Sequence, residues 1–240
     1  ATTFTAATTF TGGISGDLSV DTDTLHVDST NNRVGIGTTS PLRSLHVSGA
    51  GDTGLMLQTT NAVDDKEIWE IQAAADGSNH ANLIMRTRVN AGTGGSEAMR
   101  INNNGVVTIP NQPAFFARHT TAAAYTSAYI TNWSSVTYNV GNHFNGSTGV
   151  FTSPVAGVYQ LNAMIGNNYA NGIGNYDVRV NNTQVAGLIF DPFAGQNTWA
   201  TNVLVGQVKV SANDTVRIYV NGAGYPDNAS WTSWSMCLIS

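Results

Sequence analysis

The side chains that could carry out chemistry are few and scattered in this sequence. The histidines are His26, His46, His80, His119 and His143, and none has a second His or Cys at a zinc-finger or H-E-x-x-H spacing. The single cysteine, Cys237, excludes an intrachain disulfide, and its apolar run Met236–Ile239 favours a small buried side chain over a reactive thiol. We therefore expect no metal site and no cofactor.

Acidic residues give no clear sign of hydrolytic chemistry. A glycosidase needs two carboxylates roughly 5–10 Å apart across a cleft. The C-terminal half contains four candidates, Asp177, Asp191, Asp214 and Asp227. Nothing in their sequence spacing indicates that any two of them lie at this distance. Asp191 precedes a proline and Asp214 sits between Asn213 and Thr215, so both suit turns. We expect a protein that is not an enzyme, with a polysaccharide depolymerase as a weaker alternative.

Three polar, aromatic segments are better candidates for binding. Sugar recognition uses an aromatic face for the apolar side of the ring, and amide or carboxylate groups for the hydroxyls. The segments 167–176, 190–199 and 222–228 hold this combination and read as loops. The predicted ligand-binding residues are Tyr169, Asn171, Tyr176, Asp191, Phe193, Gln196, Tyr225 and Asp227. Trp199, Trp231 and Trp234 lie on strand patterns, which favours the core or a subunit interface.

Composition excludes several classes of protein. The formal net charge is −5 and the only lysines are Lys66 and Lys209, so no basic stripe for nucleic acid is present. No apolar run approaches the roughly 18 residues that a membrane span needs. The polar residues are mainly Thr, Ser and Asn, with 25 glycines, which is typical of strands and tight turns.

The elements that must hold these loops are predicted to be strands. Val136, Tyr138 and Val140 alternate with polar residues, which is the period of a half-buried strand. Ten such strands are predicted over Phe115–Arg118, Tyr129–Trp133, Val136–Val140, Gly149–Ser153, Gly157–Gly166, Asn175–Val180, Gln184–Phe190, Trp199–Val210, Thr215–Asn221 and Ser230–Ile239. Many short strands with frequent turns indicate an all-β sandwich.

The segment Asn142–Tyr159 carries a recognisable pattern. It reads N-H-F and then G-x-F-x-x-P-x-x-G-x-Y, from Asn142 and from Gly149 respectively. This pattern resembles the signature of the complement C1q globular head. The resemblance implies a jelly roll related to the tumour-necrosis-factor fold, assembled as a homotrimer, in which loops on a rigid sandwich bind ligands.

The N-terminal half resembles a different kind of protein. Leu25-His26-Val27 recurs as Leu45-His46-Val47, and the stretch from Asn32 onward reads N-R-V-G-I-G-T-T-S-P. This string is similar to shaft motifs of bacteriophage tail fibres, which implies an intertwined trimeric β shaft. On a threefold axis His26 or His46 would form a ring able to hold a metal. Strand alternation instead favours both histidines facing outward, with Leu and Val inward.

These patterns divide the chain. We predict β-shaft repeats over 1–54, a strand-rich shaft or neck module over 55–110, a linker over 111–113 and a C1q-like jelly-roll head over 114–240. Pro110 and Pro113 flank and stiffen that linker.

The predicted function follows from this organisation. We expect a homotrimeric tail-fibre tip on the virion, outside the cell, that adsorbs to a bacterial surface glycan or another host receptor. It would join other tail or neck proteins through its N-terminal side. The sequence begins at Ala1 without an initiator Met or a signal peptide, so we expect it to start inside a longer chain. A purely structural virion fibre and a bacterial adhesin are the alternatives. No nucleic acid and no membrane insertion is expected.

Overall fold

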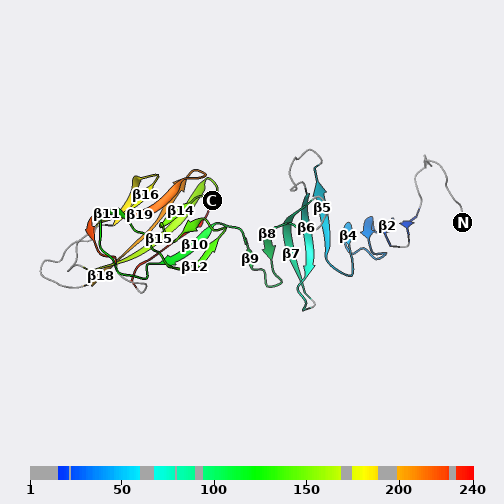
Figure 1. Cartoon of the computed structure of the whole chain (residues 1–240). Helices are drawn as coiled ribbons and strands as arrows, with labels where there is room; N and C mark the ends of the chain where they lie inside the picture. The colour runs from blue at the N-terminus through cyan, green and yellow to red at the C-terminus, as the bar shows by residue number, and fades with distance from the viewer. Residues whose placement is uncertain are drawn as a thin grey trace. The chain divides into compact units, whose positions relative to one another are not determined.

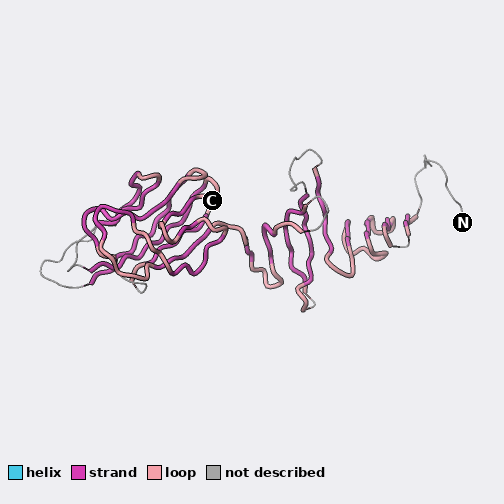
Figure 2. Tube along the Cα trace, in the orientation of Figure 1, coloured by secondary structure: helices cyan, strands magenta, loops and turns pink. Residues whose placement is uncertain are grey.

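The structure is a computed structural model that describes residues 16–21, 23–59, 68–78, 80–89, 94–168, 175–188, 199–226 and 231–240. Every regular element in these ranges is a β-strand, as the trace in Figure 2 shows. The all-β class is therefore confirmed. None of the described residues forms a helix long and apolar enough to cross a membrane. The chain divides into two compact units, Ala1–Pro110 and Asn111–Ser240.

The first unit contains two small sheets (Figure 1). The first sheet has the order β1-β2-β3-β4, from β1 (Leu18–Val20), β2 (Leu25–Asp28), β3 (Arg33–Ile36) and β4 (Leu45–Val47). The second is an antiparallel meander of β5 (Thr53–Gln58), β6 (Ile68–Ala75), β7 (Ala81–Arg88), β8 (Glu97–Ile101) and β9 (Val107–Thr108). Only the pairing of β3 with β4 is parallel among these described strands.

The expected orientation of the shaft histidines is wrong for a single chain. His26 is buried, and its Nδ1 lies 2.7 Å from the Ser19 hydroxyl of the neighbouring strand. Leu45 and Val47, which flank His46, are exposed instead. A four-stranded sheet of such short strands has too little material to cover its apolar side chains, so these remain on the surface of the isolated chain.

The second unit is a sandwich of two sheets. Its strands are β10 (Ala114–Arg118), β11 (Tyr125–Tyr129), β12 (Ser135–Val140), β13 (Phe144–Asn145), β14 (Val150–Thr152), β15 (Gly157–Asn168), β16 (Asn175–Val180), β17 (Thr183–Leu188), β18 (Trp199–Val210), β19 (Thr215–Gly224) and β20 (Ser233–Leu238). One sheet has the order β12-β10-β20-β15-β18 and the other β13-β14-β19-β16-β17, with β11 paired to β19. This is the jelly-roll arrangement that was expected.

Aromatic rings fill the space between the two sheets. Phe115 is fully buried, stacks on Phe144 at 4.1 Å between ring centroids, and meets Trp234 edge-on at 4.7 Å. Each such ring stabilises the fold by about 1.5–3 kcal/mol through burial alone. Trp133 and Tyr159 extend this core. The head therefore has an apolar centre of its own.

One predicted strand is misplaced. The pattern predicted Tyr129–Trp133, whereas β11 ends at Tyr129. Asn132 has a left-handed φ of 60°, which breaks the extended backbone. The Trp133 indole N–H donates to the carbonyl of Ile130, so this buried tryptophan lies in the irregular segment after β11 and not in a strand.

Candidate ligand-binding site

The strands that flank the three predicted loops end side by side. Asn168 at the end of β15 pairs with Trp199 at the start of β18. Tyr176 near the start of β16 pairs with Leu188 at the end of β17, and Asn175 pairs with Asn221 of β19. All three loops therefore leave the sandwich at the same end, which we call the loop end.

The chain enters the head at the opposite end. The backbone N–H of Leu238 donates to the carbonyl of Pro113, and the Gln112 side-chain amide also donates to Leu238. Gly157 and Val210, the first residue of β15 and the last of β18, pair at this same end. The 12-residue strands β15 and β18 separate the two ends of the head (Figure 1). The loop end thus lies a full strand length from the entering segment.

Asn167 fixes two of the loop bases. Its side chain is fully buried, and its Oδ1 accepts hydrogen bonds from the Tyr176 hydroxyl at 2.6 Å and from the backbone N–H of Tyr225 at 2.8 Å. Asn167 also forms a β-bridge with Pro226. One amide thereby joins the end of β15, the start of β16 and the segment after β19. Sequence reasoning did not single out this residue, since nothing in the pattern shows that its amide points inward.

Two of the predicted ligand-binding residues can be placed. Tyr176 is 1% exposed and belongs to the core, and burial raises the pKa of its hydroxyl. Its ring face is therefore closed to a ligand in this structure. Tyr225 is partly buried, with its backbone held by Asn167. The other predicted residues lie outside the described ranges: Tyr169, Asn171, Asp191, Phe193, Gln196 and Asp227.

Trp231 is an aromatic residue that the strand pattern assigned to the core or to an interface. The structure places it in a turn before β20, 54% exposed. The next residue, Thr232, is buried and fixes this turn, because its hydroxyl lies 3.2 Å from the backbone nitrogen of Gly166. A side chain at Gly166 would collide with the Cβ of Trp231. The loop end therefore presents a flat apolar ring on a fixed backbone, which suits stacking against a sugar. Trp234, by contrast, is in the core as predicted.

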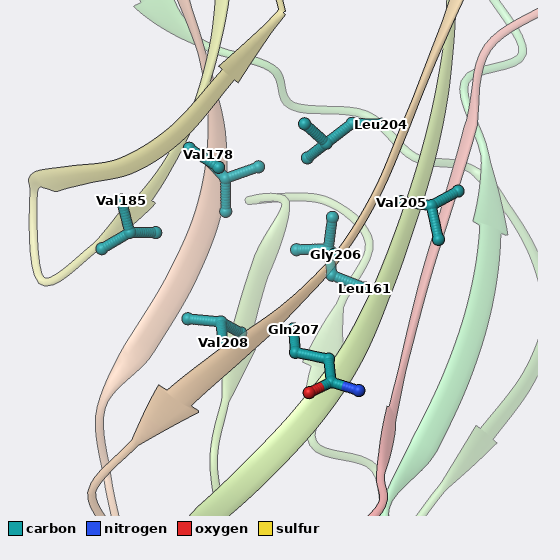
Figure 3. A pocket seen from close by; sticks show the side chains of 9 residues that line it. Leu161, Val178, Val185, Leu204, Val205, Gly206, Gln207 and Val208 are labelled. Atoms are coloured by element: carbon teal, nitrogen blue, oxygen red, sulfur yellow. The ribbon is translucent and has the colours of Figure 1, made fainter.

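An open apolar cleft lies at the edge of the sandwich between β17 and β18. Figure 3 shows Val185, Leu204 and Val208 around it, and its volume is about 140 Å³. Among the described residues that line it, Gln207 has the only polar side chain. Val203 and Val205 on the same edge strand are more than half exposed. This edge suits apolar contacts and offers little to a sugar.

The described residues show no arrangement for catalysis. No three His, Cys, Asp or Glu side chains among them lie close enough to hold a metal. Asp17, Ser19 and His26 are neighbours, but the Asp17 carboxylate is 3.8 Å from the His26 Nε2. Its Oδ1 instead accepts from the backbone and hydroxyl of Ser29. The Ser19 hydroxyl therefore lacks the positioned acid that an activated nucleophile requires. Cys237 is only partly buried, so its predicted burial was overestimated.

Comparisons with known proteins show what the second unit is similar to. No curated protein matches the sequence. Among solved structures, the globular domain of zebrafish complement 1qA protein is 18% identical with a TM-score of 0.43, over 54% of this chain and 98% of that one. Eiger TNF from S. frugiperda is 8% identical with a TM-score of 0.43, over 54% of this chain and 94% of that one. Murine APRIL is 7% identical with a TM-score of 0.41, over 53% of this chain and 99% of that one.

A family model gives the assignment. The model described as C1q domain matches residues 114–235, from the first strand of the head into its last strand. The N-H-F and G-x-F-x-x-P-x-x-G-x-Y residues all fall inside this match. Because the match covers just over half of the sequence, the chain belongs to the C1q domain family.

Proposed function

We propose that this chain is the tip of a bacteriophage tail fibre, which adsorbs as a homotrimer to a glycan on the bacterial surface. The observation that carries the proposal is the convergence of three loop bases at the end of the head opposite to the entering chain. A tip that reads a surface needs its variable segments at the far end of a rigid body. The sandwich supplies that body, and the loops supply aromatic and amide groups.

The assembly and the location belong to the same proposal. Val203 and Val205 expose an apolar edge on the head that a second copy of the head would cover. Three identical sites on one trimer convert weak contacts with single sugars into firm attachment. The fibre stands on the virion outside the cell, and its N-terminal side joins other tail or neck proteins. In this proposal the head binds its target without cleaving it.

Binding to bacteria tests this proposal directly. The purified protein is incubated with a panel of bacterial strains before and after periodate oxidation of their surface glycans. Tyr169→Ala, Phe193→Ala, Tyr225→Ala and Trp231→Ala variants are measured alongside, and Val155→Ala serves as the control, because Val155 is exposed in the segment just before β15, at the opposite end of the head.

Three results distinguish the possible functions. Loss of binding after periodate and in the loop-end variants, with the control unchanged, supports a glycan-reading tip. Binding that survives periodate oxidation contradicts the proposal that the receptor is a glycan. If no strain is bound, a structural fibre is the better account.

A further inference from the structure

The second sheet of the first unit has its apolar side chains on the surface. Strand register places Leu55 and Leu57 of β5 beside Ile71 and Trp69 of β6, and Leu83 of β7 follows on the same face. Val107 of β9 continues this face through its pairing with Ile101. These six residues, which define the apolar face, are each between 40% and 56% exposed.

The opposite face of this sheet carries the charges. The Arg88 Nε donates to the Glu70 carboxylate at 2.6 Å, and Arg100 donates to both oxygens of Glu97 at 2.9 Å and 2.6 Å. Residues on this face are nonetheless well covered, and Ile68, Gln72, Ala74 and Ile84 are at most 5% exposed. A half-buried sheet usually covers its apolar face and exposes its polar face to solvent. In the single chain this sheet does the reverse, and its apolar face is left open.

The open area is large enough for a stable contact. Six side chains that are each about half exposed leave roughly 500 Å² of apolar surface, if a full side chain offers about 150–200 Å². The largest apolar patch on a typical single-chain protein is about 300–600 Å² and is often functional. One partner contributes about 800 Å² to a standard interface. The apolar face alone supplies more than half of that.

We propose that other copies of this chain cover the apolar face, so that the first unit is an assembly element separate from the head. The register positions of this face hold no charged residue, so like faces meet without burying a charge or opposing like charges. The same exposure recurs at Leu45 and Val47 in the first sheet. Copies that run in the same direction bring each sheet against the same sheet of a neighbour, which covers every one of these faces at once.

This inference rests on the homotrimer of the proposed function and adds the contact that builds it in the first unit. The test uses the full chain with Cys237→Ser, which removes the native thiol. One variant carries Leu57→Cys on the apolar face. The matched control carries Met56→Cys, because Met56 is the preceding residue of β5, is 45% exposed, and pairs with Glu70 on the charged face. Both are treated with a short bis-maleimide and analysed on denaturing gels.

The expected result is crosslinked oligomer with the Leu57→Cys variant and monomer with the Met56→Cys control. In addition, a Leu55→Gln, Leu57→Gln, Trp69→Gln variant should dissociate at a higher protein concentration than the wild type in sedimentation, because only the contact of the heads remains. Equal crosslinking of both cysteine variants, or crosslinking of neither, would overturn the inference. A wild type that sediments as a monomer would overturn the homotrimer as well, whereas failure to bind bacteria would leave this interface untouched.

Discussion

A single buried amide organises the loop end of the head. The side-chain oxygen of Asn167 accepts from the hydroxyl of Tyr176 on β16 and from the backbone N–H of Tyr225 after β19. Leaving a buried donor unpaired costs about 1–3 kcal/mol, so this arrangement holds the loop bases in one position. The loops that start from these bases can then vary in sequence without disturbing the sandwich.

The buried hydroxyl of Tyr176 predicts an alkaline limit to stability. Burial raises its pKa in the folded head, whereas in the unfolded chain the hydroxyl ionises near its ordinary value of about 10. Above that pH the unfolded state releases a proton that the folded state keeps, so the free energy of unfolding falls as pH rises. Tyr176→Phe lacks this group. We expect the wild type to be about 1 kcal/mol more stable than the variant at pH 7 through its hydrogen bond.

That advantage should shrink between pH 9 and pH 11. Urea denaturation followed by tryptophan fluorescence at several pH values measures it, because Trp133 and Trp234 are both in the core. Tyr159, whose pKa is also raised by burial, is present in both proteins and cancels in the difference. Parallel pH curves for the two proteins would contradict the assignment.

Tyr176 also shows what a residue-level pattern can and cannot give. It lies next to a glycine-rich segment, which suggested a loop. Yet Tyr176, Val178 and Val180 alternate, and that period places Tyr176 on the inward face of β16. The strand was predicted with its correct bounds, so the inward position could have been inferred. The burial of Asn167 could not, because a polar residue at a strand end carries no sign of its partners.

At the scale of elements, the turn that leads into β14 depends on Gly149. Its φ is +67°, and a Cβ there would lie 2.2 Å from the carbonyl oxygen of Ile130, which accepts the indole N–H of Trp133. We expect Gly149→Ala to destabilise the head by at least about 2 kcal/mol, because both the left-handed backbone and the collision are unfavourable.

The matched control for this change is Gly206→Ala in β18. A Cβ at Gly206 would meet no atom within 4 Å. Thermal unfolding of both variants measures the difference, and Gly206→Ala should remain within about 0.5 kcal/mol of the wild type. Equal melting temperatures for the two variants would show that the turn tolerates a side chain.

Strand bounds were predictable where alternation runs without interruption. Asn175–Val180 and Trp199–Val210 match the structure at both ends. The prediction failed at Tyr129–Trp133, where apolar residues continue past the end of β11 while the backbone turns at Asn132. A hydrophobic pattern reports which residues are buried, but not whether a strand or a turn buries them.

At the scale of the whole molecule, every sheet leaves apolar residues uncovered in a single chain. In the head this concerns Val203 and Val205, which alternate outward on β18. Val205→Asp should lower the melting temperature of the head by roughly 5 °C, since an apolar contact worth about 1.5–3 kcal/mol is replaced by a charge. Val155→Asp is the control, because it makes the same change at another exposed valine, and it should leave the melting temperature unchanged. Differential scanning calorimetry measures both, and equal effects would place Val205 outside any subunit contact.

The division into regions and the trimer could be proposed from sequence, whereas the inverted sheet could not. Strand alternation separates two faces but does not say which of them the remaining chain covers. Here Ile84 and Gln72 are covered, while the more apolar face with Trp69 and Leu83 is open. Only the register of four strand pairings brings the open residues together.

The position of β20 in the head has a consequence for protein synthesis. This strand is the last of the head to be synthesised, yet it lies between β10 and β15 and contributes Trp234 and Met236 to the core. Roughly 115 residues separate β10 from β20, so at about 5–20 residues per second β10 waits some 6–25 s for its neighbour. A chain whose translation stops before Ser233 leaves the ring of Phe115 uncovered and cannot complete its head. The order of the strands thus lets the sandwich close only after the whole head has been translated.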